Sequence, residues 1–286
     1  MARAGAGCAY GARMTQLSTL VSGALLLTAG ALGACSGEVS TNGDDDDPAA
    51  SADAGPAAGA DGAPAAPDAA ADDGLAAACA PVITYENTVT SGNDARFEAH
   101  VTDKQAYFAA RSLEVCKVLY KNGAEVPPRP TLKFVLEDTD GVAYTLCGGD
   151  NCGEMHLNAG YVAQIGGNTA AIDAEIDGVI VHELGHVFQH SAGGPPGWLI
   201  EGEADFVRYR AGYIPLSNRH AGGNYDDAYQ TTAFFLDYVD RTYPDTGYKL
   251  NQSKNPANHP TWSDEIFVTL TGNTVQALWD DYQASL

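Results

Sequence analysis

The residues best suited to chemistry are two histidines and a glutamate in the segment HELGH, residues 182–186. His182 and His186 are four positions apart, so in a helix they project from one face and can present two imidazole nitrogens to one metal ion. Glu183 lies one step round the helix, where it can reach a water on that ion without binding the ion. Zn²⁺ lowers the pKa of a bound water towards neutrality, and a carboxylate can then accept its proton. The segment therefore predicts a zinc site that activates water.

The surroundings of this segment favour a functional site over a chance match. The preceding residues, IDGVIV, are apolar and predict a buried helix rather than a solvated helix with two surface histidines. Gly185 lies inside this helix, where glycine costs about 1 kcal/mol relative to alanine. Asp173 or Asp177 lies near the helix start, where negative charge is favourable. Such departures from local rules concentrate at functional sites.

The third metal ligand is expected outside this helix. The metzincin pattern would place another histidine six residues after His186, but Ala192 stands there. His190 continues the four-residue spacing, yet three ligands so placed along a straight helix are too far apart to converge on one ion. We therefore interpret His190 as a rim or structural residue.

The segment PPGWLIEGEADFVRYR predicts a second helix that supplies the missing ligand. Glu201 and Asp205 are four residues apart and hence on one face of this helix. We expect Glu201 to be the third ligand and Asp205 to accept a hydrogen bond from a metal-bound imidazole. Glu203 points elsewhere and is expected to be solvated.

The first 35 residues are predicted to be a signal peptide with a lipobox. Arg3 and Arg13 precede an apolar run from about Leu17 to Ala34, which ends at Cys35. Small residues before Cys35 resemble a bacterial lipobox, in which that cysteine is lipidated, although an ordinary signal peptide with an incidental cysteine is the alternative. We expect an exported protein: an outer-membrane lipoprotein facing the periplasm or cell surface, attached to the membrane only by its lipid, or otherwise a secreted protein.

Residues 36–78 are predicted to be a disordered tether, because they are almost wholly Ala, Asp, Gly, Pro and Ser. The whole chain has a net charge of −22, and residues 37–80 carry ten carboxylates and no basic side chain. From residue 81 onward, 13 basic residues face 27 acidic ones, a net charge of −14. This charge would repel a phosphate backbone and argues against nucleic acid as a partner.

The predicted domain, residues 79–286, contains four cysteines. An even number in an oxidising compartment predicts two disulfides. Cys147 and Cys152 are close in sequence and are expected to pair, which leaves Cys79 to pair with Cys116. A cysteine-based zinc site is the alternative, but the usual two-residue spacing is missing.

The order of the predicted elements favours an α+β domain, because strands come first and helices follow. We expect a small N-terminal mixed sheet and a mainly helical C-terminal half, and the resemblance of HELGH with a downstream Glu to the zincins implies a zincin-like domain. Thr102 and Gln105 predict a capping box for a helix of about twenty residues that ends near Asn122-Gly123. The remaining expectations are a strand at 81–90, a hairpin over 131–146, a strand at 153–165 that could pair with an extended substrate, helices near 173–190, 199–211 and 227–242, and two short C-terminal helices.

Four separated segments resemble the basic secretory protein family of zinc peptidases: DGVIVHELGHVFQH, LIEGEADFVRYRAGY, AYQTTAFFLDYV and EIFVTLTGNTVQALWDDYQ. The resemblance runs from about residue 81 to the end of the chain. It implies a gluzincin-like fold in which His182, His186 and Glu201 bind one Zn²⁺, Glu183 is the base, and the substrate is a peptide or protein. The domain is acidic despite the family's name, so a preference for the partners of a basic protein does not carry over.

Three functions are compatible with these residues. In the first, a zinc metallopeptidase, Glu183 activates a water that attacks the peptide carbonyl, and Tyr229, Tyr225 or His220 could stabilise the oxyanion. Tyr229 also fits an apolar helical stripe and could belong to the core instead. The alternatives are a surface-tethered binding module with a non-catalytic zinc site and a zinc hydrolase of non-peptide amides or esters. Glu183 argues against the binding module, because a structural zinc site has no use for a base. The sequence makes no prediction of the oligomeric state.

Overall fold

The computed structural model describes residues 74–148 and 151–286, which form ten α-helices and one four-stranded sheet. The predicted signal peptide, the lipidation site Cys35 and most of the predicted tether lie outside the described residues. The last residues that we assigned to the tether instead form a short helix, α1 (Leu75–Ala78), whose Leu75 and Ala78 pack against the core. No helix in this described part is long and apolar enough to cross a membrane.

The sheet is mixed, as predicted, and its strand order is β1-β2-β4-β3. β2 runs parallel to both β1 and β4, whereas β3 is antiparallel to β4. The strands are β1 (Val82–Asn87), β2 (Thr131–Glu137), β3 (Ala143–Gly148) and β4 (Asn151–Asn158). The described sheet therefore ends at β3, which leaves the outer edge of that strand unpaired.

Two strand predictions are wrong. The hairpin over 131–146 does not form, because β4 lies between β2 and β3. β2 has four buried apolar side chains, which favours a place inside the sheet with a parallel neighbour on each side. The predicted strand at 153–165 ends at Asn158, whose side chain accepts a hydrogen bond from the Gly160 N–H and starts helix α4 (Ala159–Gln164). Since β4 is internal, it is not the strand that an extended substrate could join.

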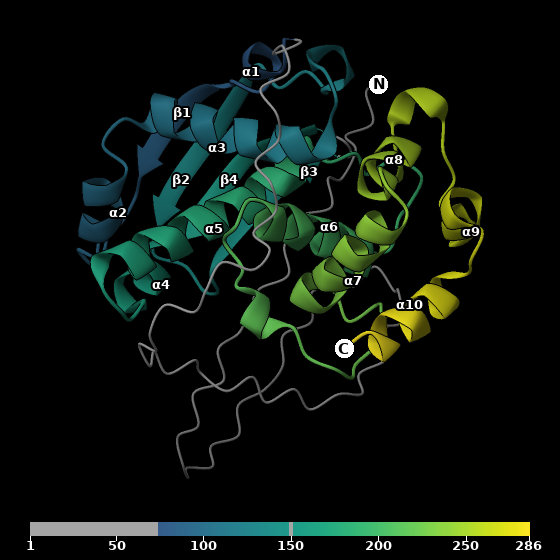
Figure 1. Ribbon diagram of the computed structural model, residues 1–286. Helices are drawn as coiled ribbons and strands as arrows, with labels where there is room; N and C mark the ends of the chain where they lie inside the picture. Colours follow the sequence, from purple (N-terminus) through teal and green to yellow (C-terminus); the bar gives the residue numbers. More distant parts are fainter. Residues whose placement is uncertain (1–73, 149–150) are drawn as a thin grey trace, which may run out of the picture.

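Two long helices cover one face of the sheet, as Figure 1 shows: α3 (Lys104–Leu119) and α5 (Thr169–Phe188). α3 begins one residue later than predicted, because the side chain of Asp103, not Thr102, accepts the capping hydrogen bond from the Ala106 N–H. It ends before Asn122-Gly123, since Tyr120 is already extended. Helix α2 (Ala95–His100) precedes it.

The C-terminal half is helical, as predicted, but three helices rather than two follow the one near 227–242. Its helices are α6 (Gly197–Arg210), α7 (Tyr229–Thr242), α8 (Thr246–Ser253), α9 (Glu265–Thr271) and α10 (Val275–Ala284). One apolar cluster lies between the sheet and α3 and α5, and a second lies among α6 to α10. α6 contributes to both clusters, with Val207 in the first and Leu199 and Phe206 in the second.

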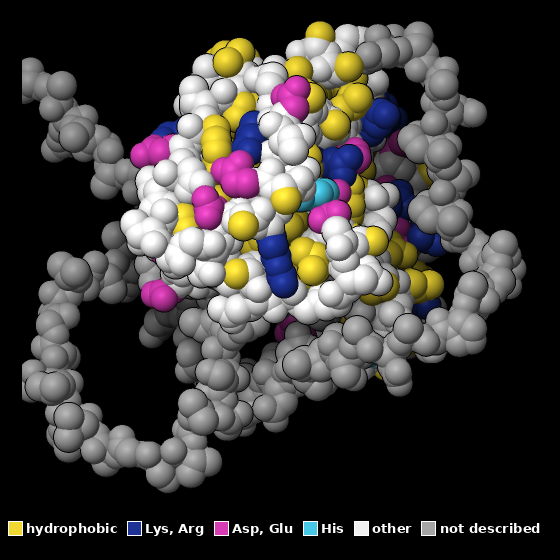
Figure 2. All heavy atoms as spheres, turned by 90° about the vertical axis from the view of Figure 1, so that its left-hand side faces the viewer, with side chains coloured by type: hydrophobic (Ala, Val, Ile, Leu, Met, Phe, Trp, Pro, Cys, Tyr) yellow, Lys and Arg dark blue, Asp and Glu magenta, His cyan; other side chains and the backbone are white. Residues whose placement is uncertain are grey.

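Both predicted disulfides are present. Cys79 pairs with Cys116 and ties the start of the domain to α3, and Cys147 pairs with Cys152 across the β3–β4 connection. On the face that Figure 2 shows, acidic, basic and apolar side chains are interspersed, and Lys and Arg do not gather into a patch.

Candidate metal centre

Two helices bring the three predicted ligands together where the two apolar clusters meet. His182 and His186 lie on α5, Glu201 lies on α6, and one ligand atom from each side chain lies within 4.8 Å of the others. The two Nε2 atoms are 3.2 Å apart, and each is 3.3 Å from Oε2 of Glu201. α5 and α6 approach closely because Gly185 has no side chain: a Cβ there would lie 3.0 Å from Cα of Ala204. Helix packing thus explains the glycine at position 185.

These distances fit one zinc ion. An ion at 2.0–2.1 Å from each of its tetrahedral ligands holds those ligands about 3.3–3.4 Å apart. Two imidazole nitrogens and a carboxylate oxygen form a donor set of catalytic zinc sites, in which a fourth position stays open. His190 does not belong to this group. Its backbone N–H donates to Asn251 and its ring packs edge-on against Tyr120, so its role is structural, as expected.

Asp205 contacts His182, one of the proposed ligands, as the sequence predicted. Asp205 is buried on α6, and its Oδ1 lies 2.7 Å from Nδ1 of His182. Nδ1–H donates to this carboxylate, which leaves the lone pair of Nε2 for a metal. Burial disfavours a charged His182, but the carboxylates of Asp205, Glu201 and Glu183 together outweigh burial and raise the pKa of His182 to about 10. Burial likewise opposes ionisation of Glu201, yet its hydrogen bonds with the two histidines hold its pKa well below the usual range.

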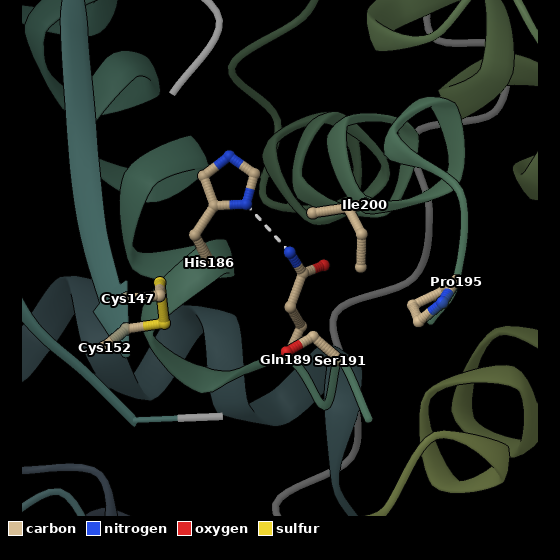
Figure 3. Close-up of a pocket in the computed structure, with 7 residues that line it drawn as sticks. All are labelled: Cys147, Cys152, His186, Gln189, Ser191, Pro195 and Ile200. Atoms are coloured by element: carbon tan, nitrogen blue, oxygen red, sulfur yellow. Dashed lines mark hydrogen bonds between the residues drawn. A yellow bond between two sulfur atoms is a disulfide. The ribbon is translucent and has the colours of Figure 1, made fainter. Parts of the chain in front are cut away.

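Gln189 supports the other histidine, which the sequence reasoning missed. The Gln189 amide lies 2.8 Å from Nδ1 of His186, along the dashed line in Figure 3. The amide oxygen and nitrogen are interchangeable by a flip, and only the oxygen can accept from Nδ1–H and leave Nε2 for a metal. A usable signal was present, because Gln189 follows His186 by only three residues, although α5 ends at Phe188 and Gln189 is its extended C-cap.

Glu183 is held by the sheet. Glu183 is 5% exposed, and its Oε2 accepts a hydrogen bond of 2.7 Å from the hydroxyl of Thr145, a residue on β3 that is 0% exposed. This contact joins the edge strand to the helix of the metal ligands. No sequence pattern near Thr145 predicts its contact with Glu183, because that contact depends on how the sheet packs against α5.

Tyr229 faces the centre instead of filling the core. Its half-buried ring lies nearly parallel to that of His182, with centroids 6.0 Å apart. Tyr229 and the preceding Ala228 have φ values of 42° and 67°, a left-handed conformation that is strained for residues other than glycine. Burial, followed by the charge of Glu201, raises the pKa of Tyr229, so its hydroxyl stays a hydrogen-bond donor.

The other two tyrosine or histidine candidates are placed elsewhere. Tyr225 packs against Trp198 at 5.4 Å, and His220 is exposed, with Nδ1 3.1 Å from the carbonyl of Asn218. Of the three candidates, Tyr229 is the one that stacks on a ligand histidine.

The prediction that Glu203 is solvated is wrong. Its side chain is 3% exposed and forms an ion pair with Lys254, which is 1% exposed. The cause is that α6 is buried on nearly all sides, between α5 on one side and α7 on the other. A residue that points away from the metal centre therefore still points into protein.

The comparison with family models then identifies the chain. A model described as "Peptidase of plants and bacteria" matches residues 82–282. The chain belongs to this family. The match confirms the resemblance drawn from the sequence and covers every residue of the centre described above. The family is one of peptidases, which implies that the substrate is a peptide or a protein. No curated protein and no solved structure matched the chain.

Proposed function

We propose that this peptidase is zinc-dependent and hydrolyses peptide bonds with a water that Glu183 activates. The observation that carries the proposal is the spacing of 3.2–3.3 Å among the ligand atoms of His182, His186 and Glu201, which suits one tetrahedral ion. When bound, Zn²⁺ would act as a Lewis acid and lower the pKa of a water towards neutrality.

Glu183 then carries the proton. One oxygen of its carboxylate is fixed by Thr145, so the other oxygen is available to accept the proton of the attacking water. After the water oxygen has bonded to the carbonyl carbon, Glu183 delivers that proton to the amide nitrogen as the C–N bond breaks, so the product leaves as a neutral amine. The proton balance closes without any other acid.

Tyr229 is the proposed donor to the oxyanion that forms on the carbonyl. Its hydroxyl is protonated, its ring is stacked beside His182, and the strained backbone at Ala228 fixes where the helix starts. A preorganised donor at this position stabilises charge that develops in the transition state.

The arrangement supports catalysis over a structural zinc site. A structural site is closed by four protein ligands, whereas this centre has three ligands with Glu183 beside them, buried and outside the ligand group. A base in that place has a function only if a water has to be deprotonated.

We also propose that the protein is exported and lipidated at Cys35. The two disulfides support export, because such bonds persist in oxidising compartments. Labelling with palmitate tests the anchor: wild type should be labelled and Cys35→Ser should not. Equal labelling of both proteins would reject lipidation at this residue.

The test of the peptidase proposal combines metal analysis with peptide cleavage. Wild type should bind one zinc ion and cleave a mixed peptide pool, and Glu183→Gln should keep the zinc but lose activity by about 100-fold or more, because general-base catalysis contributes that much. Glu175→Gln is the matched control, since Glu175 is on the same helix but pairs with Arg208. A Glu183→Gln variant that binds zinc and cleaves like wild type would contradict the mechanism, and cleavage of esters or non-peptide amides alone would favour a different hydrolase.

A further inference from the structure

A pocket lies directly beside the metal centre. It opens to solvent, so its empty space of about 340 Å³ includes open solvent at its mouth, and one proposed ligand, His186, lies in its wall. Figure 3 shows the disulfide on one side of the Gln189 amide and Ile200 with Pro195 on the other. The lining residues are Cys147, Cys152, His186, Gln189, Ser191, Pro195 and Ile200.

The lining of this pocket has a definite chemical character. The disulfide of Cys147 and Cys152, together with Ile200 and Pro195, gives it an apolar wall. None of the seven lining residues is a Lys, Arg, Asp or Glu. A charged side chain that entered would lose its water without gaining a partner of opposite charge, which is costly. The pocket therefore favours an apolar occupant.

One polar atom in the wall points to a ligand. Gln189 is 3% exposed and contacts His186 through one end of its amide, while the other end is buried without a hydrogen-bond partner in the described structure. Buried polar atoms are nearly always paired, so such an atom calls for an explanation. If the oxygen faces His186, as metal binding requires, the amide N–H₂ is the group left to donate into the pocket. A peptide carbonyl or a tyrosine hydroxyl at the pocket could accept that bond.

The position of the pocket indicates which substrate residue would enter it. His186 ligates through Nε2 and meets Gln189 through Nδ1, so one imidazole ring separates the metal position from this amide. An extended peptide advances about 3.3 Å per residue. A side chain in the pocket therefore belongs to a residue at the cleaved bond or next to it.

We propose that this pocket is the specificity subsite of the peptidase and receives an apolar side chain, aliphatic or aromatic, close to the cleaved bond. The inference rests on the proposed function, because the occupant is taken to be part of a peptide substrate. The apolar lining of the pocket does not depend on that function. Ile200 forms one wall, the Cys147–Cys152 disulfide forms another, and Gln189 supplies the single hydrogen bond.

Cleavage of a peptide library tests the subsite through two changes at Ile200 that act in opposite directions. Wild type should prefer Phe or Leu to Asp or Lys by about 10-fold or more at one substrate position, the scale at which hydrophobic pockets discriminate. Ile200→Phe should fill the pocket and shift the preference to small residues, and Ile200→Ala should shift it to larger ones. Ile214→Ala is the matched control, because Ile214 is also 4% exposed but lies outside the pocket. Unchanged preferences in both Ile200 variants with full zinc content would overturn the subsite while leaving the peptidase proposal intact.

A binding measurement separates the two proposals. The zinc-loaded Glu183→Gln variant is titrated with blocked peptides that differ at one residue, Phe, Leu, Ala or Asp, while the methyl resonances of Ile200 are followed by NMR. Shifts with Phe and Leu that Ala and Asp do not produce would support the subsite even if wild type cleaved none of these peptides. Equal shifts with all four peptides, or none with any of them, would overturn it.

Discussion

Thr145 offers the sharpest test of how the fold supports the reaction, because it touches Glu183 without belonging to the metal ligands. The hydroxyl donates to Oε2 of Glu183 over 2.7 Å, and both groups are buried. A hydrogen bond to a charged group contributes about 1.5–3 kcal/mol. Since about 1.4 kcal/mol corresponds to tenfold in rate, Thr145→Val should lower kcat by about 10- to 150-fold if the bond is needed in the transition state.

The assay measures kcat and KM on one cleaved peptide, with zinc content and thermal unfolding measured on the same samples. Thr145→Val should keep its zinc and KM, because Thr145 contacts neither a ligand nor the proposed subsite. Thr145→Ser, which keeps the hydroxyl, should restore most of kcat even if it costs stability. The reasoning is refuted if kcat of Thr145→Val falls by no more than about twofold, because the expected loss is at least about tenfold. It is also refuted if the Ser and Val variants lose kcat equally.

Three further predictions concern the metal centre. Asp205→Asn should weaken zinc affinity by about 10- to 100-fold, as measured by competition with a chelator, and unchanged affinity would exclude its role beside His182. Glu201→Gln should lose zinc, whereas Glu203→Gln should keep it but lose about 3–5 kcal/mol of unfolding free energy, because Lys254 is left as an unpaired buried charge; the reverse pattern of zinc loss would exchange the two roles. Zinc uptake at pH 8 should release a proton, because the pKa of His182 is raised to about 10 in the metal-free protein and a ligating imidazole must be neutral. Calorimetry in buffers of different ionisation enthalpy would count the released protons. No release would contradict the raised pKa of His182.

The sequence predicted the centre well where one helix fixes the relation between residues. His182 and His186, and likewise Glu201 and Asp205, are pairs four residues apart, so helical geometry alone brings each pair to one face. That α5 and α6 would meet was inferred from chemistry, and the contact of Gly185 with Ala204 explains how they do.

The predictions failed where packing between elements decides the outcome. The order of strands in the sheet depends on long-range pairing, so β4 could enter between two strands that look like a hairpin in sequence. Helical periodicity suggests one buried face, but α6 is buried almost all round, and Glu203 with it. Thr145 reaches Glu183 only because the sheet packs against α5, a relation that no local pattern of residues contains.

The proposed metal ligands lie close together along the chain, whereas two of the groups that act beside them, Thr145 and Tyr229, come from distant segments. His182, His186, Gln189, Glu201 and Asp205 all lie within α5, α6 and the loop between them, whereas Thr145 comes from the sheet and Tyr229 from α7. Contacts between nearby residues form early in folding, and contacts between distant ones form late. We therefore expect the ligands and Glu183 to come together before Thr145 and Tyr229 reach their places beside them. Such an order of assembly would keep a partly folded peptidase less active than the native one, because its oxyanion donor and the support of its base would still be missing.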